Sequence, residues 1–147
     1  MTVIELPSAE ILRAGAHAAE PAKLHPAARF RDGVTDLDMA RILLALDRGV
    51  PIVMKGYRWT VPAHSPLLAK LASVMSEGIR LGLIHSAIEK TGPNTHRQVA
   101  VAAPVHLRSA DNPDRPACPR PKGIKRFRLM NAEGIRYVDC PACKELA

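Results

Sequence analysis

The C-terminal part of the chain contains all three cysteines, and their spacing constrains the fold more than any other feature. Cys140 and Cys143 are two residues apart in "DCPACK", the spacing of a zinc knuckle, and 21 residues separate Cys118 from Cys140. A closed structural zinc site needs four ligands. From Pro104 onward the chain is rich in proline and poor in large apolar side chains, so it can bury little surface by itself. We therefore expect a metal ion to hold this segment together.

The fourth ligand has several candidates. His106 lies 12 residues before Cys118, and the turn residues "SADNPDRP" between them can reverse the chain. "IKRFRLM" and "IRYVD", joined by "NAEG", predict two strands that bring the three thiols together. Spacing alone leaves His96, Asp139 and water as alternatives. His96 is expected near the tip of a hairpin, and the side chain of Asp139 would point away from the site if it lay on a strand.

The pattern "VHLRSAD…ACPRP…VDCPAC" resembles the zinc-ribbon tail of small proteins from actinobacteria and their phages. The resemblance covers only residues 104–147. It implies that the bound ion is Zn²⁺, that the tail is a zinc ribbon, and that the protein comes from an actinobacterium or a phage. It implies no activity. The metal ligands that it implies are His106, Cys118, Cys140 and Cys143.

The rest of the chain is expected to be α+β. An N-terminal helix over 9–19 and a loop occupy residues 1–34, and residues 35–103 form the main domain. The spacing of apolar residues predicts a helix over 36–48, capped by Thr35. "PIVMKGYRWTV" predicts a hairpin with Lys55-Gly56 at its turn.

A second helix, over 66–81, and a second hairpin follow. Ser65 is the expected N-cap, and a second hairpin is predicted from "LIHSAIE" and "QVAVAA". The expected buried stripe of the helix is Leu68, Leu71, Met75 and Ile79, and its expected exposed face is Lys70, Ser73, Glu77 and Arg80. The order of elements resembles a winged helix-turn-helix in topology only. The alternative is an α+β domain whose helices merely pack on a sheet.

The charge of the chain favours an anionic partner. The net charge is +7 at pH 7, and the run "RPKGIKRFR" is the densest basic segment. On a strand, Arg126 and Arg128 would share one face and could lie along a phosphate backbone. The alternative is that these cations balance the negative charge of a zinc–thiolate site. The candidate nucleic-acid-binding residues are Arg120, Lys122, Lys125, Arg126 and Arg128.

Known catalytic motifs do not occur in the sequence. It has no Gly-rich phosphate loop, Gly-x-Ser-x-Gly turn or His-Glu-x-x-His run, and no His-x-Glu pattern of a zinc deaminase. A catalytic zinc would require that His106 is not a ligand, leaving three thiolates and water. We therefore expect a non-enzymatic, regulatory nucleic-acid-binding protein. The alternative is an interaction module that docks on a host or phage protein through the ribbon and the Trp59 hairpin.

The cellular compartment is expected to be the cytoplasm. No apolar run approaches the roughly 18 residues of a membrane span, so no membrane partner is expected. The N-terminus lacks the basic and apolar regions of a secretory signal. An odd number of cysteines argues for metal binding over a disulfide framework.

Overall fold

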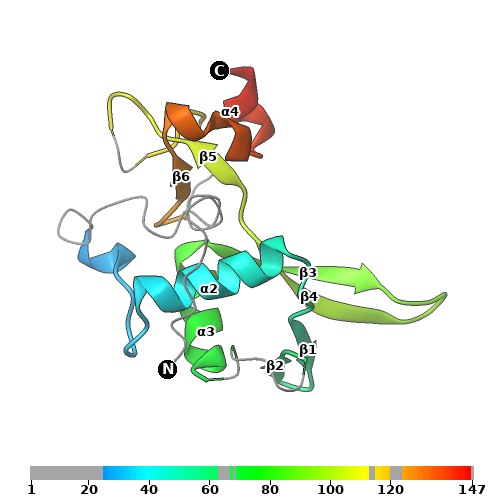
Figure 1. Cartoon of the computed structure of the whole chain (residues 1–147). Helices are drawn as coiled ribbons and strands as arrows, with labels where there is room; N and C mark the ends of the chain where they lie inside the picture. Colours follow the sequence, from blue (N-terminus) through cyan, green and yellow to red (C-terminus); the bar gives the residue numbers. More distant parts are fainter. Residues whose placement is uncertain (1–24, 63–66, 68, 113–114, 120–123, 147) are drawn as a thin grey trace, which may run out of the picture.

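The computed structural model describes residues 25–62, 67, 69–112, 115–119 and 124–146 (Figure 1). The helix expected over 9–19 and the expected cap Ser65 lie outside these residues. The fold is mixed α+β, as predicted. In chain order its elements are η2 (Pro26–Ala28), α2 (Asp36–Asp47), β1 (Val53–Lys55), β2 (Arg58–Thr60), α3 (Leu71–Leu81), β3 (Ile84–Lys90), β4 (His96–Ala102), β5 (Val105–Leu107), β6 (Arg128–Met130), η4 (Ala132–Tyr137) and α4 (Pro141–Glu145).

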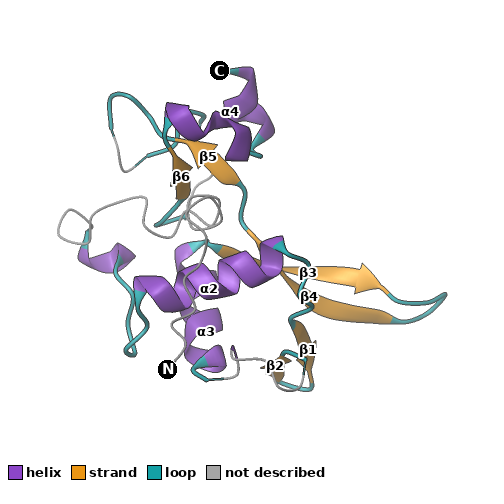
Figure 2. Ribbon diagram, in the orientation of Figure 1, coloured by secondary structure: helices purple, strands orange, loops and turns teal. Residues whose placement is uncertain are grey.

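Two antiparallel hairpins join into one sheet of four strands in the order β2-β1-β4-β3, with β1 and β4 paired at Val53 and Val99. Both hairpins were predicted from the sequence. The first turn is shifted by one residue, however, because Lys55 pairs with Arg58 and leaves Gly56 and Tyr57 as the turn. Gly56 has a φ of 62°, a conformation that favours glycine. The second hairpin extends away from the helices (Figure 2).

Helix α2 confirms the prediction for residues 36–48 to within one residue. The Thr35 hydroxyl accepts a hydrogen bond from the Asp38 amide, and the Asp38 carboxylate accepts one from the Thr35 amide, so a complete capping box begins the helix. Its buried residues pack against α3 and β4. They are Met39, Ala40, Ile42, Leu43, Leu44 and Ala45.

Helix α3 differs from its prediction in start and in orientation. It begins at Leu71 instead of residue 66, because Lys70 has a left-handed backbone with a φ of 60°. Ile79, expected in the core, is 41% exposed, whereas Glu77, expected on the surface, is only 3% exposed. Arg80 explains the difference, because its guanidinium donates to the Glu77 carboxylate and so allows this carboxylate to be buried.

The described residues form two hydrophobic cores. The larger one lies between α2, α3 and the four-stranded sheet, where Met39, Leu43, Met75 and Leu81 are fully buried. The smaller one lies in the tail and includes the three cysteines with Val105, Met130 and Val138. The tail therefore has a core of its own, built around the candidate metal ligands. Among the described residues, no helix is long and apolar enough to cross a bilayer.

In the described part of the tail, the segments "IKRFRLM" and "IRYVD" do not pair with each other as two strands. Strand β6 pairs with β5, and the two run parallel. The predicted strand "IRYVD" is wrong, because its first residues lie in the 3₁₀ helix η4. After η4 the amides of Asp139 and Cys140 donate to the Val105 carbonyl, so the chain returns to β5 and not to β6.

The tail docks at the C-terminal end of α3. The Leu81 carbonyl accepts hydrogen bonds from the amides of Lys125 and Arg126, both at 3.1 Å. Gly82 ends α3 with a φ of 85°, and a Cβ there would come within 2.8 Å of the Ile124 side chain. Glycine at this position therefore permits both the end of the helix and the close approach of the tail.

Candidate metal centre

Four buried side chains from separate parts of the tail meet in its small core. Their ligand atoms all lie within 4.8 Å of one another, close enough to hold one metal ion. None is more than 7% exposed. They are His106, Cys118, Cys140 and Cys143, the set implied by the zinc-ribbon resemblance.

A reversed loop places Cys118 beside His106. His106 lies on β5, and the chain leaves this strand through Arg108 and turns at Ser109, whose hydroxyl accepts from the amides of Asp111 and Asn112. The returning segment runs antiparallel to the end of β5, with hydrogen bonds from the Ala117 amide to the Leu107 carbonyl and from the Ser109 amide to the Arg115 carbonyl. The chain therefore reverses between His106 and Cys118, as predicted.

The other two cysteines lie at the start of α4. Cys140 is the N-cap residue of this helix, and Cys143 lies in its first turn with no exposed surface. The Val105 carbonyl accepts from the Cys140 amide, and the Asp139 carboxylate accepts from the Val105 amide. These bonds fix Cys140 next to the residue that precedes His106. The knuckle is therefore anchored to the same strand that carries the histidine.

Three of the distances between the ligand atoms are close to those expected around a tetrahedral ion. The Nδ1 atom of His106 lies 3.4 Å from the Cys118 Sγ and 3.7 Å from the Cys143 Sγ, and the Cys118 and Cys140 sulfurs are 3.9 Å apart. Zinc bonds of about 2.3 Å to sulfur and about 2.0 Å to nitrogen place tetrahedral sulfurs about 3.8 Å apart, and sulfur and nitrogen about 3.5 Å apart. The donor set of three sulfurs and one nitrogen is also one that zinc prefers.

Burial shifts the pKa values of two of the candidate ligands, His106 and Cys118. It raises the pKa of the Cys118 thiol to about 12, and the neighbouring Cys143 and Cys140 thiols add to this effect. Burial also lowers the pKa of His106, although the negative charge of Asp139 opposes that shift. The imidazole is therefore held in the neutral form that binds metals, whereas the Cys118 thiol needs a cation nearby to lose its proton.

The two other candidate side chains for the fourth ligand lie outside the cluster. His96 is the exposed first residue of β4, in the main domain. Asp139 adjoins Cys140, but its carboxylate binds the Val105 amide. Of the candidate side chains, only His106 lies in the cluster with the three cysteines.

Two arginines of the basic segment are buried, although the sequence predicted that they would be available to a phosphate backbone. Arg126 is 6% exposed and pairs with Asp36 of α2 at 2.7 Å, with its guanidinium 4.2 Å from the centre of the Phe30 ring. Arg128 is 1% exposed and pairs with Asp47 at 2.5 Å. Both arginines are therefore buried and paired with carboxylates, whereas the sequence pattern predicts that they share an exposed face of a strand. Of the other three, only Lys125 lies among the described residues, where it is exposed; Arg120 and Lys122 lie outside them.

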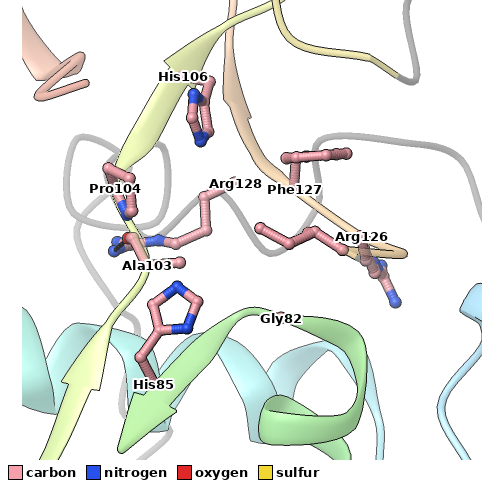
Figure 3. Close-up of a pocket in the computed structure, with 9 residues that line it drawn as sticks. Gly82, His85, Ala103, Pro104, His106, Arg126, Phe127 and Arg128 are labelled. Atoms are coloured by element: carbon pink, nitrogen blue, oxygen red, sulfur yellow. Dashed lines mark hydrogen bonds between the residues drawn. The ribbon is translucent and has the colours of Figure 1, made fainter. Parts of the chain in front are cut away.

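These two arginines connect the tail to both ends of α2. Asp36 is the first residue of the helix and Asp47 its last, and Arg128 also donates to the Ala103 carbonyl at 2.7 Å. A small pocket of about 190 Å³ remains between the tail and the sheet (Figure 3). His106 lines its tail side and His85 its sheet side. No local sequence pattern indicates this arrangement, because each ion pair joins residues more than 80 positions apart.

Comparison with protein-family models, with curated proteins and with solved structures finds no match to this chain. The possible role of the His106, Cys118, Cys140 and Cys143 cluster therefore rests on its geometry alone. The resemblance of the tail to zinc ribbons and of the main domain to winged helices stays a prediction.

Proposed function

We propose that His106, Cys118, Cys140 and Cys143 bind one Zn²⁺ as a structural ion. Four protein ligands complete a tetrahedral shell and leave no position for water or substrate, which is the pattern of structural and not catalytic zinc. The ligands are the centre of the only core that the tail has among the described residues. The ion would therefore contribute to the folding of the tail and would do no chemistry.

We further propose that the protein is a non-enzymatic nucleic-acid-binding protein. One observation carries this proposal: among the described residues, 13 cations but only five carboxylates are exposed. Asp36, Asp38, Asp47 and Glu77 all pair with cations of the protein. The exposed cations among the described residues are Arg29, Arg31, Arg41, Arg48, Lys55, Arg58, Lys70, Lys90, Arg97, Arg115, Lys125, Arg136 and Lys144, and the exposed carboxylates are Asp32, Glu89, Asp111, Glu133 and Glu145.

This excess of exposed cations favours binding to polyanions. The exposed face of α3, however, contains no cation: it consists of Ala72, Ser76 and Ile79. A helix that reads bases in a major groove needs donors such as Arg, Lys, Asn or Gln on that face. The proposal is therefore binding through the basic surface, and not insertion of α3 into a groove.

The test is a mobility-shift titration of the zinc-loaded protein with labelled duplex and single-stranded DNA. We expect complexes at low salt that weaken steadily as salt rises, because each phosphate contact adds about −0.9 to the slope of log K against log salt on a duplex and about −0.7 on a single strand. Absence of any shift at low salt with either probe would contradict nucleic-acid binding.

A protein-interaction module is the second candidate function. The observation that favours it is the β3–β4 hairpin, which exposes Ile88 by 68% and Val101 by 45%. Apolar side chains on a projecting hairpin offer a contact for another protein. This function takes precedence if the titration finds no complex and a binding partner is recovered from nuclease-treated extract.

A further inference from the structure

The turn of the β1–β2 hairpin combines three exposed side chains that the fold does not use. We define the hairpin tip as residues Lys55, Gly56, Tyr57 and Arg58. Tyr57 is 103% exposed, so its ring contacts nothing in the protein. Lys55 and Arg58 are also exposed, and they form the last cross-strand pair before the turn.

This arrangement is unfavourable for the isolated protein. Like charges on directly opposite residues of a hairpin destabilise it. Within the described part of the chain, no carboxylate lies within ion-pair distance of Lys55 or Arg58. The other hairpin shows the favourable alternative, because Glu89 and Arg97 are cross-strand partners joined at 2.8 Å. An external anion that binds at the tip would therefore relieve the repulsion between Lys55 and Arg58.

The strand residues next to the tip are anchored to the rest of the protein. Trp59, which follows Arg58 and pairs with Met54, packs against the main core. The Thr60 hydroxyl donates to the Val53 carbonyl at 3.0 Å. The tip thus presents an aromatic ring between two cations on an anchored support.

We propose that the hairpin tip is a contact site for single-stranded nucleic acid. Tyr57 stacks on a base, and Lys55 and Arg58 contact the phosphates on either side of it. This inference rests on the proposed nucleic-acid binding and assigns it a site. A single strand is the partner that fits, because its bases offer open faces for aromatic stacking, whereas the bases of a duplex are covered by their neighbours.

The site is separate from the metal centre. The β1–β2 hairpin and the tail with α4 lie at opposite ends of the molecule (Figure 1). Substitutions at the tip therefore leave the metal ligands and both cores untouched. Arg136 and Lys144, two exposed cations of the tail, offer a control that removes the same charge elsewhere.

The experiment measures fluorescence anisotropy of a labelled oligothymidylate, and of a duplex of the same length, with the zinc-loaded full chain over a range of salt. Tyr57→Ala should weaken single-strand binding at least about fivefold without changing the salt slope, and Tyr57→Phe should stay within about twofold of the wild type. Lys55→Gln/Arg58→Gln should flatten the slope by about 1.4, the sum of two single-strand phosphate contacts. Arg136→Gln/Lys144→Gln should flatten it much less.

Each other result contradicts a definite part of the account. If the wild type binds but Tyr57→Ala and the tip double variant behave like the control, the tip is not the site, although nucleic-acid binding stands. A loss from Tyr57→Ala that is equal on duplex and single strand overturns stacking on an open base. If the wild type binds neither probe at low salt, the proposed function fails and the tip site with it.

Discussion

His106 combines two roles at the level of a single residue. Its Nδ1 atom faces the Cys118 and Cys143 sulfurs, while its ring meets the edge of Phe127 with centroids 5.7 Å apart. Burial keeps the imidazole neutral and ready to bind a cation. The spacing of the cysteines predicted that a fourth ligand was needed. The structure adds that the chain reverses after β5, which places His106 beside Cys118.

His106→Ala tests this role against His96→Ala. Removing one of four ligands should speed the loss of zinc to a chelator at least tenfold, because the ion would be left with an open position. His96→Ala should release zinc at the wild-type rate, since His96 is exposed on β4. The release is followed with a colorimetric zinc indicator. Equal release from the two variants would remove His106 from the ligand set.

Among the elements, β5 connects the metal centre to the main domain. It carries His106, its Val105 carbonyl receives the amides of Asp139 and Cys140, and it pairs with β6. Arg128, the first residue of β6, then reaches Asp47 at the end of α2. A cation near a helix C-terminus is favourable, so this ion pair also offsets the poor placement of Asp47 there.

Arg128→Met tests the connection. This substitution removes the cation of the buried Arg128–Asp47 ion pair. Loss of one partner of a buried ion pair lowers the free energy of unfolding by about 3 kcal/mol or more. Asp47→Leu/Arg128→Met should recover more than half of the loss, because an apolar pair needs no neutralisation. Urea unfolding of the zinc-loaded proteins measures both changes. A single variant within about 0.5 kcal/mol of the wild type would show that the ion pair does not hold the tail.

The elements also show where sequence reasoning succeeds. Helix α2 could be predicted because its capping box and apolar stripe are local. The orientation of α3 could not, because Glu77 is buried through Arg80, which in turn donates to the Ala27 and Arg29 carbonyls about 50 residues away. Likewise, the pattern of the basic segment predicts a surface strand. The carboxylates that bury two of its arginines lie 81 and 90 positions earlier in the chain.

At the scale of the whole molecule, two cores of different origin are joined by ion pairs and a few backbone hydrogen bonds. The main core is made of aliphatic side chains and contains no metal ligand. Half of the buried residues in the tail core are cysteines. The main domain should therefore keep its fold without a metal ion, whereas the tail should not.

Chelation tests this division. Removing zinc should abolish the hydrogen-exchange protection of amides in β5, β6 and α4, because their core loses the ion at its centre. Amides of α2 and β4 should stay protected, although docking of the tail will weaken. Mass spectrometry of peptic fragments measures both regions in one experiment. Simultaneous loss of protection in both would show that the chain folds as one unit around the ion.

We have proposed that three cysteines and one histidine coordinate a single zinc ion with tetrahedral geometry. X-ray absorption at the zinc edge, on protein purified with ample zinc, tests it most directly. We expect one zinc per chain with three sulfur neighbours at about 2.3 Å and one nitrogen at about 2.0 Å. Protein without stoichiometric metal, or an ion with fewer than three sulfurs or with a water oxygen in place of the imidazole, would contradict it.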